Sequence, residues 1–133
     1  VIEFNTSCVP GFVQTAGIAA LTEGEPHVAA LRRELTANRD KVLAHLWAME
    51  GVEAPSPAGG MYAFFRIRGH ADSVALARRL VAEAGLGLAP GAAFGPEGEG
   101  WLRWCFAAGG TDLDEGLARL ARWVSANQGK EQD

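Results

Sequence analysis

The sequence predicts an α+β domain in which a small, mostly antiparallel sheet packs against helices. Three observations support this prediction. Segments with apolar residues at three- and four-residue steps, typical of helices, are interspersed unevenly with short β-rich runs. Segments rich in glycine and proline separate them, and the sequence contains no internal repeat. The expected order is helix, helix, strand, strand, helix, strand, strand, helix, and the uneven connections favour a sheet covered on one face.

The composition is that of a folded globular domain. Of the 133 residues, 48% are hydrophobic and 21% are charged, which is enough apolar surface for one core. The net charge is -4 and no basic run is longer than a pair, which argues against a nucleic-acid partner. No apolar run reaches membrane-spanning length and no signal-peptide pattern is present, so we expect a cytoplasmic protein without a membrane partner. The isolated cysteines Cys8 and Cys105 agree with a reducing compartment.

The chain lacks an initiator methionine and begins in the middle of a pattern at Val1, so we expect a fragment of a longer protein. Pro10 predicts the first turn of a short helix that ends at the interruption formed by residues 24–26. Beyond it, apolar residues recur at helical spacing over residues 28–49, which predicts one long amphipathic helix. Gly51 is expected to end this helix as a left-handed cap.

Turn-forming residues divide the rest of the chain into short elements. Asp72 is expected to cap one helix at its N-terminus, and Gly85 is expected to end it. The glycine-rich segment 90–100 predicts a loop. The predicted elements are, in order, a brief strand at 52–54, a strand at 61–67, a helix at 73–84, a short strand at 86–89, the clearest strand at 101–107 and a final helix at 111–124.

Arg103 is the residue that most needs an explanation. The two-residue period of a strand places it on the face opposite Leu102 and Trp104. One interpretation is a wet sheet face, on which the guanidinium is solvated or pairs with an acid from a neighbouring strand. The other is a guanidinium held rigid by apolar neighbours, which would bind a planar carboxylate through its fork of donors. Position alone leaves both interpretations open.

Other kinds of site find little support. The segment 90–100 has no lysine and leads into a strand, unlike a phosphate-binding loop. The three histidines lack metal-ligand spacing, so no metal site is expected, and no serine stands in a hydrolase motif. Lys41 lies among the polar positions of the long helix and Lys130 lies in the C-terminal tail. Neither lysine is placed to be a desolvated Schiff-base amine.

Three blocks of the sequence, in order, resemble the C-terminal part of class I/II aminotransferases, the fold-type-I enzymes that use pyridoxal 5'-phosphate. The first is P-A-G-G-M-Y at residues 57–62, which is similar to the family's entry into a strand. The second is A-P-G-A-A-F-G at residues 89–95, and the third is G-W-L-R-W-C-F-A at residues 100–107. Residues 5–21 also resemble the segment in which such enzymes leave the large domain. The resemblance therefore spans nearly the whole chain.

The resemblance implies a function for individual residues. Arg103 matches the arginine that binds the α-carboxylate of the amino-acid substrate, and Asn5, Gly60 and Tyr62 are candidates for the active-site wall. Pyridoxal 5'-phosphate and its Schiff-base lysine belong to the large domain, so this chain is expected to hold no catalytic or cofactor-binding residue and to be inactive alone. The implied partners are amino-acid and 2-oxo-acid substrates and a second subunit in a homodimer.

The resemblance also implies a division of the chain. Residues 1–24 would be the end of the large domain and an interdomain helix, residues 25–127 the small domain, and residues 128–133 a flexible tail. The amino donor cannot be identified from the sequence. Two alternatives stay open: another fold-type-I enzyme, such as a carbon–sulfur lyase or an acyl-transferring synthase, and a stand-alone module that binds small carboxylates.

Overall fold

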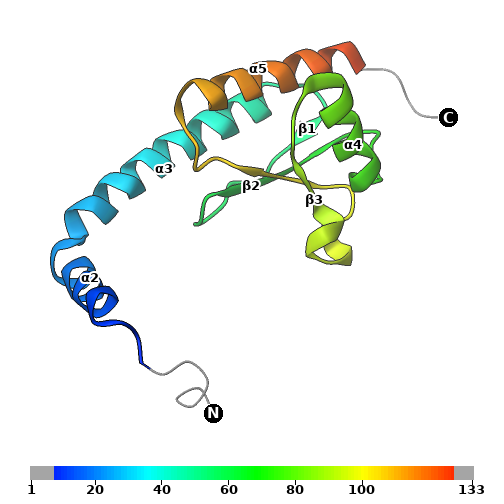
Figure 1. The fold of residues 1–133 in the computed structure, drawn as a ribbon. Helices are drawn as coiled ribbons and strands as arrows, with labels where there is room; N and C mark the ends of the chain where they lie inside the picture. The colour runs from blue at the N-terminus through cyan, green and yellow to red at the C-terminus, as the bar shows by residue number, and fades with distance from the viewer. Residues whose placement is uncertain (1–7, 128–133) are drawn as a thin grey trace. The chain divides into compact units, whose positions relative to one another are not determined.

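The computed structural model describes residues 8–127 and confirms the predicted α+β class (Figure 1). Helices and strands follow the expected order, with two short 3-10 helices added in the glycine-rich segment. The elements are α2 (Gly11–Glu23), α3 (Glu25–Trp47), β1 (Val52–Glu53), β2 (Tyr62–Ile67), α4 (Ser73–Ala84), β3 (Ala89–Pro90), η1 (Gly91–Phe94), η2 (Pro96–Gly98), β4 (Leu102–Cys105) and α5 (Gly110–Asn127).

The chain divides into two compact units, residues 1–33 and residues 34–133. The division lies within α3, whereas the sequence predicts a domain limit after residue 24. That domain assignment stays a prediction, and the predicted tail at 128–133 lies outside the described residues.

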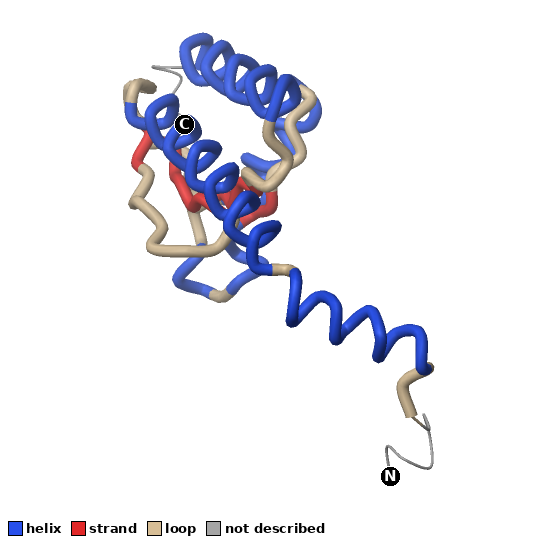
Figure 2. Tube along the Cα trace, turned by 90° about the vertical axis from the view of Figure 1, so that its left-hand side faces the viewer, coloured by secondary structure: helices blue, strands red, loops and turns tan. Residues whose placement is uncertain are grey.

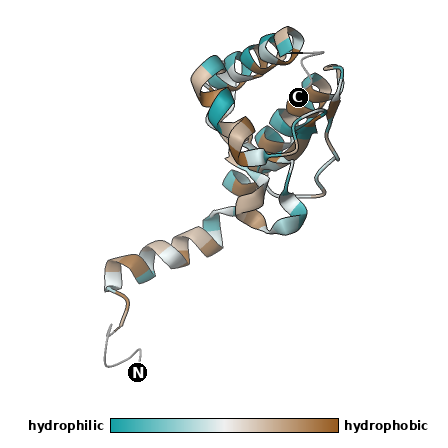
Figure 3. Ribbon diagram, turned by 90° about the vertical axis from the view of Figure 1, so that its right-hand side faces the viewer, coloured by the Kyte–Doolittle hydropathy of each residue, from teal (hydrophilic) through white to brown (hydrophobic). Residues whose placement is uncertain are grey.

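In the first unit, α2 begins after Pro10, as expected from a residue that has no N–H to leave unpaired. No residue of α2 is buried against the described part of the chain. Its large apolar side chains are open to solvent: Phe12 is 77% exposed and Leu21 is 90% exposed. Figure 3 shows this hydrophobic colouring along the helix. Residues 8–33 of this unit therefore have exposed apolar surface and no buried core.

The second unit is built on a four-stranded sheet in the order β1-β2-β4-β3. All three strand pairs are antiparallel, as the sequence predicts. In the central pair, Phe64 of β2 lies opposite Arg103 of β4. Ala89 of β3 flanks Arg103 on the other side, so the arginine stands on an inner strand of the sheet.

One face of this sheet forms the core with the second half of α3, α4 and α5 (Figures 1 and 2). Alternate residues of β2 and β4 enter the core, as the strand period requires. The fully buried contributors include Phe65 and Leu102 from the sheet and Leu46, Leu80 and Leu117 from the three helices. The second half of α3, α4 and α5 pack on this face, so these three helices leave the side chains of the opposite face free for a site.

The helix ends show which local predictions hold. Asp72 accepts a hydrogen bond from the N–H of Ala75 at 2.8 Å, and Gly85 ends α4 with a φ of 65°, both as predicted. The prediction for α3 is wrong at its end, because the helix stops at Trp47. Gly51 does have a φ of 76°, but it lies in the turn that enters β1.

The glycine-rich segment is more ordered than a loop. It folds back on itself, so that Gly91 and Gly98 lie backbone to backbone, and a Cβ on either residue would clash with the carbonyl oxygen of the other. The N–H of Gly91 also donates to the carbonyl of Trp101 at 2.7 Å. These contacts fix the path of residues 91–100, which we call the glycine clamp.

Candidate functional site

Arg103 lies on the face of the sheet opposite to α4, α5 and the second half of α3. Its neighbours in β4, Leu102 and Trp104, point into the core, so the strand period directs Arg103 to the other face. The side chain is half-buried. The backbone that carries it is held between β2 and β3 on an inner strand, which gives the side chain a fixed origin.

The guanidinium of Arg103 packs over two aromatic rings. Its central carbon lies 4.2 Å from the ring centroid of Tyr62 and 4.1 Å from that of Phe94. Tyr62 comes from β2 and Phe94 from η1 of the glycine clamp, so two separate elements converge on one cation. Both distances are within the range in which ring faces attract a guanidinium.

Within residues 8–127, the guanidinium of Arg103 makes no hydrogen bond and no ion pair. Arg66 on the same sheet face is a direct contrast: it lies 5.1 Å from the Trp101 ring centroid but donates to Glu53 at 2.8 Å. No described acid pairs with Arg103, which removes the ion-pair form of the wet-face interpretation for that part of the chain. The N–H donors of Arg103 remain available for an anion.

Phe94 is held in place by contacts on both sides of the glycine clamp. Its ring meets Phe64 edge to face, with centroids 5.7 Å apart. On the other side, the buried hydroxyl of Ser73 accepts a hydrogen bond from the N–H of Ala92 at 3.2 Å. The clamp is thus attached both to the sheet and to the first residue of α4.

Glu99 makes the second attachment to α4. One carboxylate oxygen accepts hydrogen bonds from the N–H of Ser73 at 2.7 Å and from the N–H of Gly100 at 3.0 Å. The backbone hydrogen bond from Ser73, followed by that from Gly100, lowers the pKa of Glu99 below its usual value. The ionised side chain therefore holds the end of the clamp at the N-terminus of α4, where negative charge is favoured.

The structure brings some of the predicted site residues together. Tyr62 contacts Arg103 directly. Gly60 lies two residues before it at the entry to β2, exposed and with a φ of 76°, and no described contact joins it to Arg103. Asn5 lies outside the described residues. Phe94 was not singled out from the sequence; the signal was its place in the A-P-G-A-A-F-G block, whose glycines fold the ring back toward the strand.

Other features of residues 8–127 do not form a site of this kind. No cluster of three metal-binding side chains occurs among them, and no helix there could cross a membrane. Cys8 and Cys105 are free and exposed. Lys41, the lysine of α3, forms an ion pair with Asp114 at 2.6 Å.

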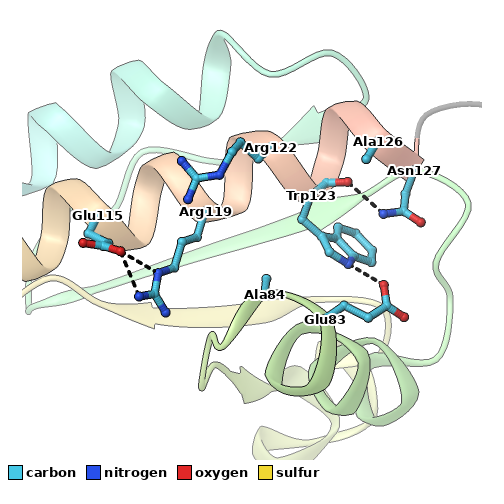
Figure 4. Close-up of a pocket in the computed structure, with 8 residues that line it drawn as sticks. All are labelled: Glu83, Ala84, Glu115, Arg119, Arg122, Trp123, Ala126 and Asn127. Carbon is cyan, nitrogen blue, oxygen red and sulfur yellow. Dashed lines mark hydrogen bonds and ion pairs between the residues drawn. The ribbon is translucent and has the colours of Figure 1, made fainter.

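A pocket of about 570 Å³ lies between α4 and α5, lined by residues of these two helices (Figure 4). Its polar side chains are largely paired with each other. The indole N–H of Trp123 donates to Glu83 at 2.7 Å, and Arg119 donates to Glu115 at 2.8 Å. None of the predicted site residues lines this pocket.

Comparison with known proteins gives one consistent group of relatives, although no family model matches the chain. The chain is 33% identical over 123 residues to a Bacillus subtilis protein named "Probable N-acetyl-LL-diaminopimelate aminotransferase", covering 92% of this chain and 31% of that protein. It is 33% identical over 117 residues to an aspartate aminotransferase of Pyrococcus horikoshii, covering 86% and 30%. The chain therefore spans about a third of the length of these relatives.

Solved structures agree with the sequence comparison. The aromatic aminotransferase of Pyrococcus horikoshii OT3 matches with a TM-score of 0.87 and 30% identity, covering 95% of this chain and 34% of that one. The aspartate aminotransferase of Thermotoga maritima matches with a TM-score of 0.78 and 30% identity, covering 92% and 31%. The fold described above is thus a substructure of these larger proteins.

Proposed function

Because this chain belongs to the class I/II aminotransferases, of which it is a C-terminal small-domain fragment, we propose that it supplies the carboxylate-binding side of their active site. The parent enzyme would transfer an amino group between an amino acid and a 2-oxo acid with pyridoxal 5'-phosphate. In this proposal Arg103 binds the α-carboxylate of the substrate.

One observation carries the proposal. Arg103 stands on a fixed inner strand, its guanidinium packs over two rings, and its donors have no partner among the described residues. A rigid guanidinium with free N–H groups is suited to bidentate binding of a planar carboxylate. Arg66, which shares the sheet face, is already satisfied by Glu53 and does not fit this role.

The described residues do not fit pyridoxal 5'-phosphate. Lys41 of α3 is paired with Asp114 of α5, and no other lysine lies within residues 8–127. The proposal therefore assigns the cofactor, and the proton transfers of the reaction, to the remaining two thirds of the parent enzyme. This chain isolated from that part is expected to be inactive.

The contribution of this chain is binding and orientation. A carboxylate held by two parallel N–H donors cannot rotate freely about its own axis, so the rest of the amino acid is aimed in one direction. The rings of Tyr62 and Phe94 keep bulk water from two sides of the guanidinium. Their low polarity strengthens the attraction between the guanidinium and the carboxylate.

The experiment that tests this proposal compares two arginine substitutions in the full-length protein. Arg103→Leu should weaken carboxylate recognition by about 3–5 kcal/mol, because one member of a desolvated charge pair is lost. Arg66→Leu is the matched control, since it removes a guanidinium from the same sheet face and is expected to leave kcat/KM nearly unchanged. A change of less than about fivefold in kcat/KM for Arg103→Leu would show that the assignment is wrong.

A further inference from the structure

We propose that Phe94 is a positioning residue for Arg103, and that the glycine clamp holds the Phe94 ring against the guanidinium. The ring holds the guanidinium in its binding orientation before a carboxylate arrives. This inference rests on the proposed function, because it concerns the arginine that the proposal assigns to the substrate carboxylate.

The surroundings of Phe94 argue against an ordinary packing role. The residue is 48% exposed, so it does not belong to the core. Its described ring contacts are with Phe64 and with the guanidinium of Arg103. A half-exposed ring that contacts one neighbouring ring and one cation adds little to the core, but it can restrict the orientation of that cation.

The attachments of the glycine clamp explain how the ring is kept in place. The close approach of Gly91 and Gly98 sets the path of the backbone on either side of Phe94. Ser73 and Glu99 then tie the two ends of the clamp to α4 through hydrogen bonds of 3.2 Å and 2.7 Å. A free loop would let the ring swing away from Arg103, whereas a segment fixed at both ends cannot.

The second ring, that of Tyr62, contacts Arg103 from a different element than Phe94 does. Tyr62 belongs to β2, which pairs with the strand that carries Arg103, so its position is set by the sheet. Phe94 belongs to the clamp and completes the enclosure of the guanidinium. Since Tyr62 would remain after loss of Phe94, removing the phenylalanine ring should loosen Arg103 without displacing it.

The expected size of the effect follows from side-chain entropy. A free arginine side chain samples many rotamers, and most of this freedom is lost when the guanidinium is held by a carboxylate. Ring contacts that order the side chain in advance remove part of this loss from the binding step. If one of the two rings accounts for about half of the ordering, its removal raises KM about fivefold.

The kinetic test uses the full-length protein with the variants Phe94→Leu and Phe94→Tyr. Phe94→Leu should raise KM for the amino-acid donor, and the inhibition constant of a short monocarboxylate, by roughly fivefold while kcat stays within about twofold. Phe94→Tyr keeps the ring face and should restore both constants. A merely structural role would lower the amount of active enzyme, which reduces apparent kcat and leaves KM unchanged.

A second measurement does not depend on any variant folding. Protons held over a ring face are shifted upfield by its ring current, so in the NMR spectrum of the 133-residue chain the side-chain protons of Arg103 should resonate upfield of those of Arg122. Arg122 packs over no ring within residues 8–127 and is the internal reference. Arg103 resonances that coincide with those of Arg122 would overturn the inference.

The kinetics of these variants distinguish failure of the positioning role from failure of the proposed function. If Arg103→Leu raises KM while Phe94→Leu leaves KM and the inhibition constant unchanged, the positioning role is wrong and the proposed function stands. If Arg103→Leu itself has no effect on KM, the proposed function is wrong and the positioning role falls with it.

Discussion

The substitution Gly98→Ala tests whether the glycine clamp depends on backbone contact. A Cβ at residue 98 would lie 2.7 Å from the carbonyl carbon of Gly91 and would clash with its oxygen. Two effects oppose each other. Alanine restricts the unfolded chain and alone would stabilise the fold by about 0.4–1 kcal/mol. The clash forces the backbone apart, as in overpacked sites, and costs about 1–3 kcal/mol.

The clash should therefore win, with a net loss of about 1–2 kcal/mol in the free energy of unfolding. Gly87→Ala is the matched control, because residue 87 is exposed, a Cβ there meets nothing within 4 Å and its φ is not left-handed. That variant should gain a few tenths of a kcal/mol or more. Urea denaturation of the 133-residue chain, followed by tryptophan fluorescence, measures both. If Gly98→Ala is as stable as Gly87→Ala, the clamp does not depend on glycine and our reasoning about it fails.

Three further predictions concern other parts of the chain. Burial, followed by the charge of Arg79, lowers the pKa of His70 below 6.5, so the unfolded chain binds the proton more readily. The free energy of unfolding should therefore fall as the pH drops from 6.5 toward the pKa of His70 in the folded chain. When the urea midpoint is plotted against pH, His70→Gln should flatten that part of the curve. The chain should form no stoichiometric adduct at Lys41 when it is mixed with pyridoxal phosphate and reduced with borohydride, because that lysine is half exposed and paired with Asp114. Mass spectrometry measures the labelling, and one fully labelled lysine would contradict this prediction. The exposed apolar residues of α2 should cause self-association of the chain. Sedimentation should show dimers or larger species, and their share should decrease when Phe12 and Leu21 are changed to Ser. A strictly monomeric chain at high concentration would contradict this prediction.

Much of the second unit could be predicted because its signals are local. The alternation in β4 places Leu102 and Trp104 in the core and Arg103 on the other face, and the structure confirms it. The cap at Asp72 and the left-handed Gly85 need only a few neighbouring residues, so they too could be read directly. Local chemistry of this kind does not depend on how distant segments meet.

The predictions that went wrong or fell short depend on distant contacts. Gly51 has the conformation of a helix cap, but the backbone turns out of α3 four residues earlier to enter β1, which pairs with β2. The ring of Phe94 reaches Arg103 because Gly91 and Gly98 touch and because Ser73, far earlier in the chain, receives the clamp. Neither periodicity nor composition contains this information.

For the candidate site, sequence reasoning could identify the arginine but not its surroundings. Its position on the strand left a solvated or paired guanidinium as open as a carboxylate-binding one. The structure adds two ring contacts and the lack of an acidic partner within residues 8–127, and these are long-range properties of β2 and η1.

The measurement that tests the central claim most directly is a crystal structure of the full-length protein with an amino-acid substrate or a non-reacting analogue bound. Our account predicts that both oxygens of the α-carboxylate lie within about 3.2 Å of two guanidinium nitrogens of Arg103. The rings of Tyr62 and Phe94 should keep their contacts with that guanidinium. A carboxylate held by other residues, with Arg103 facing solvent or paired with an acid of the parent chain, would contradict the account.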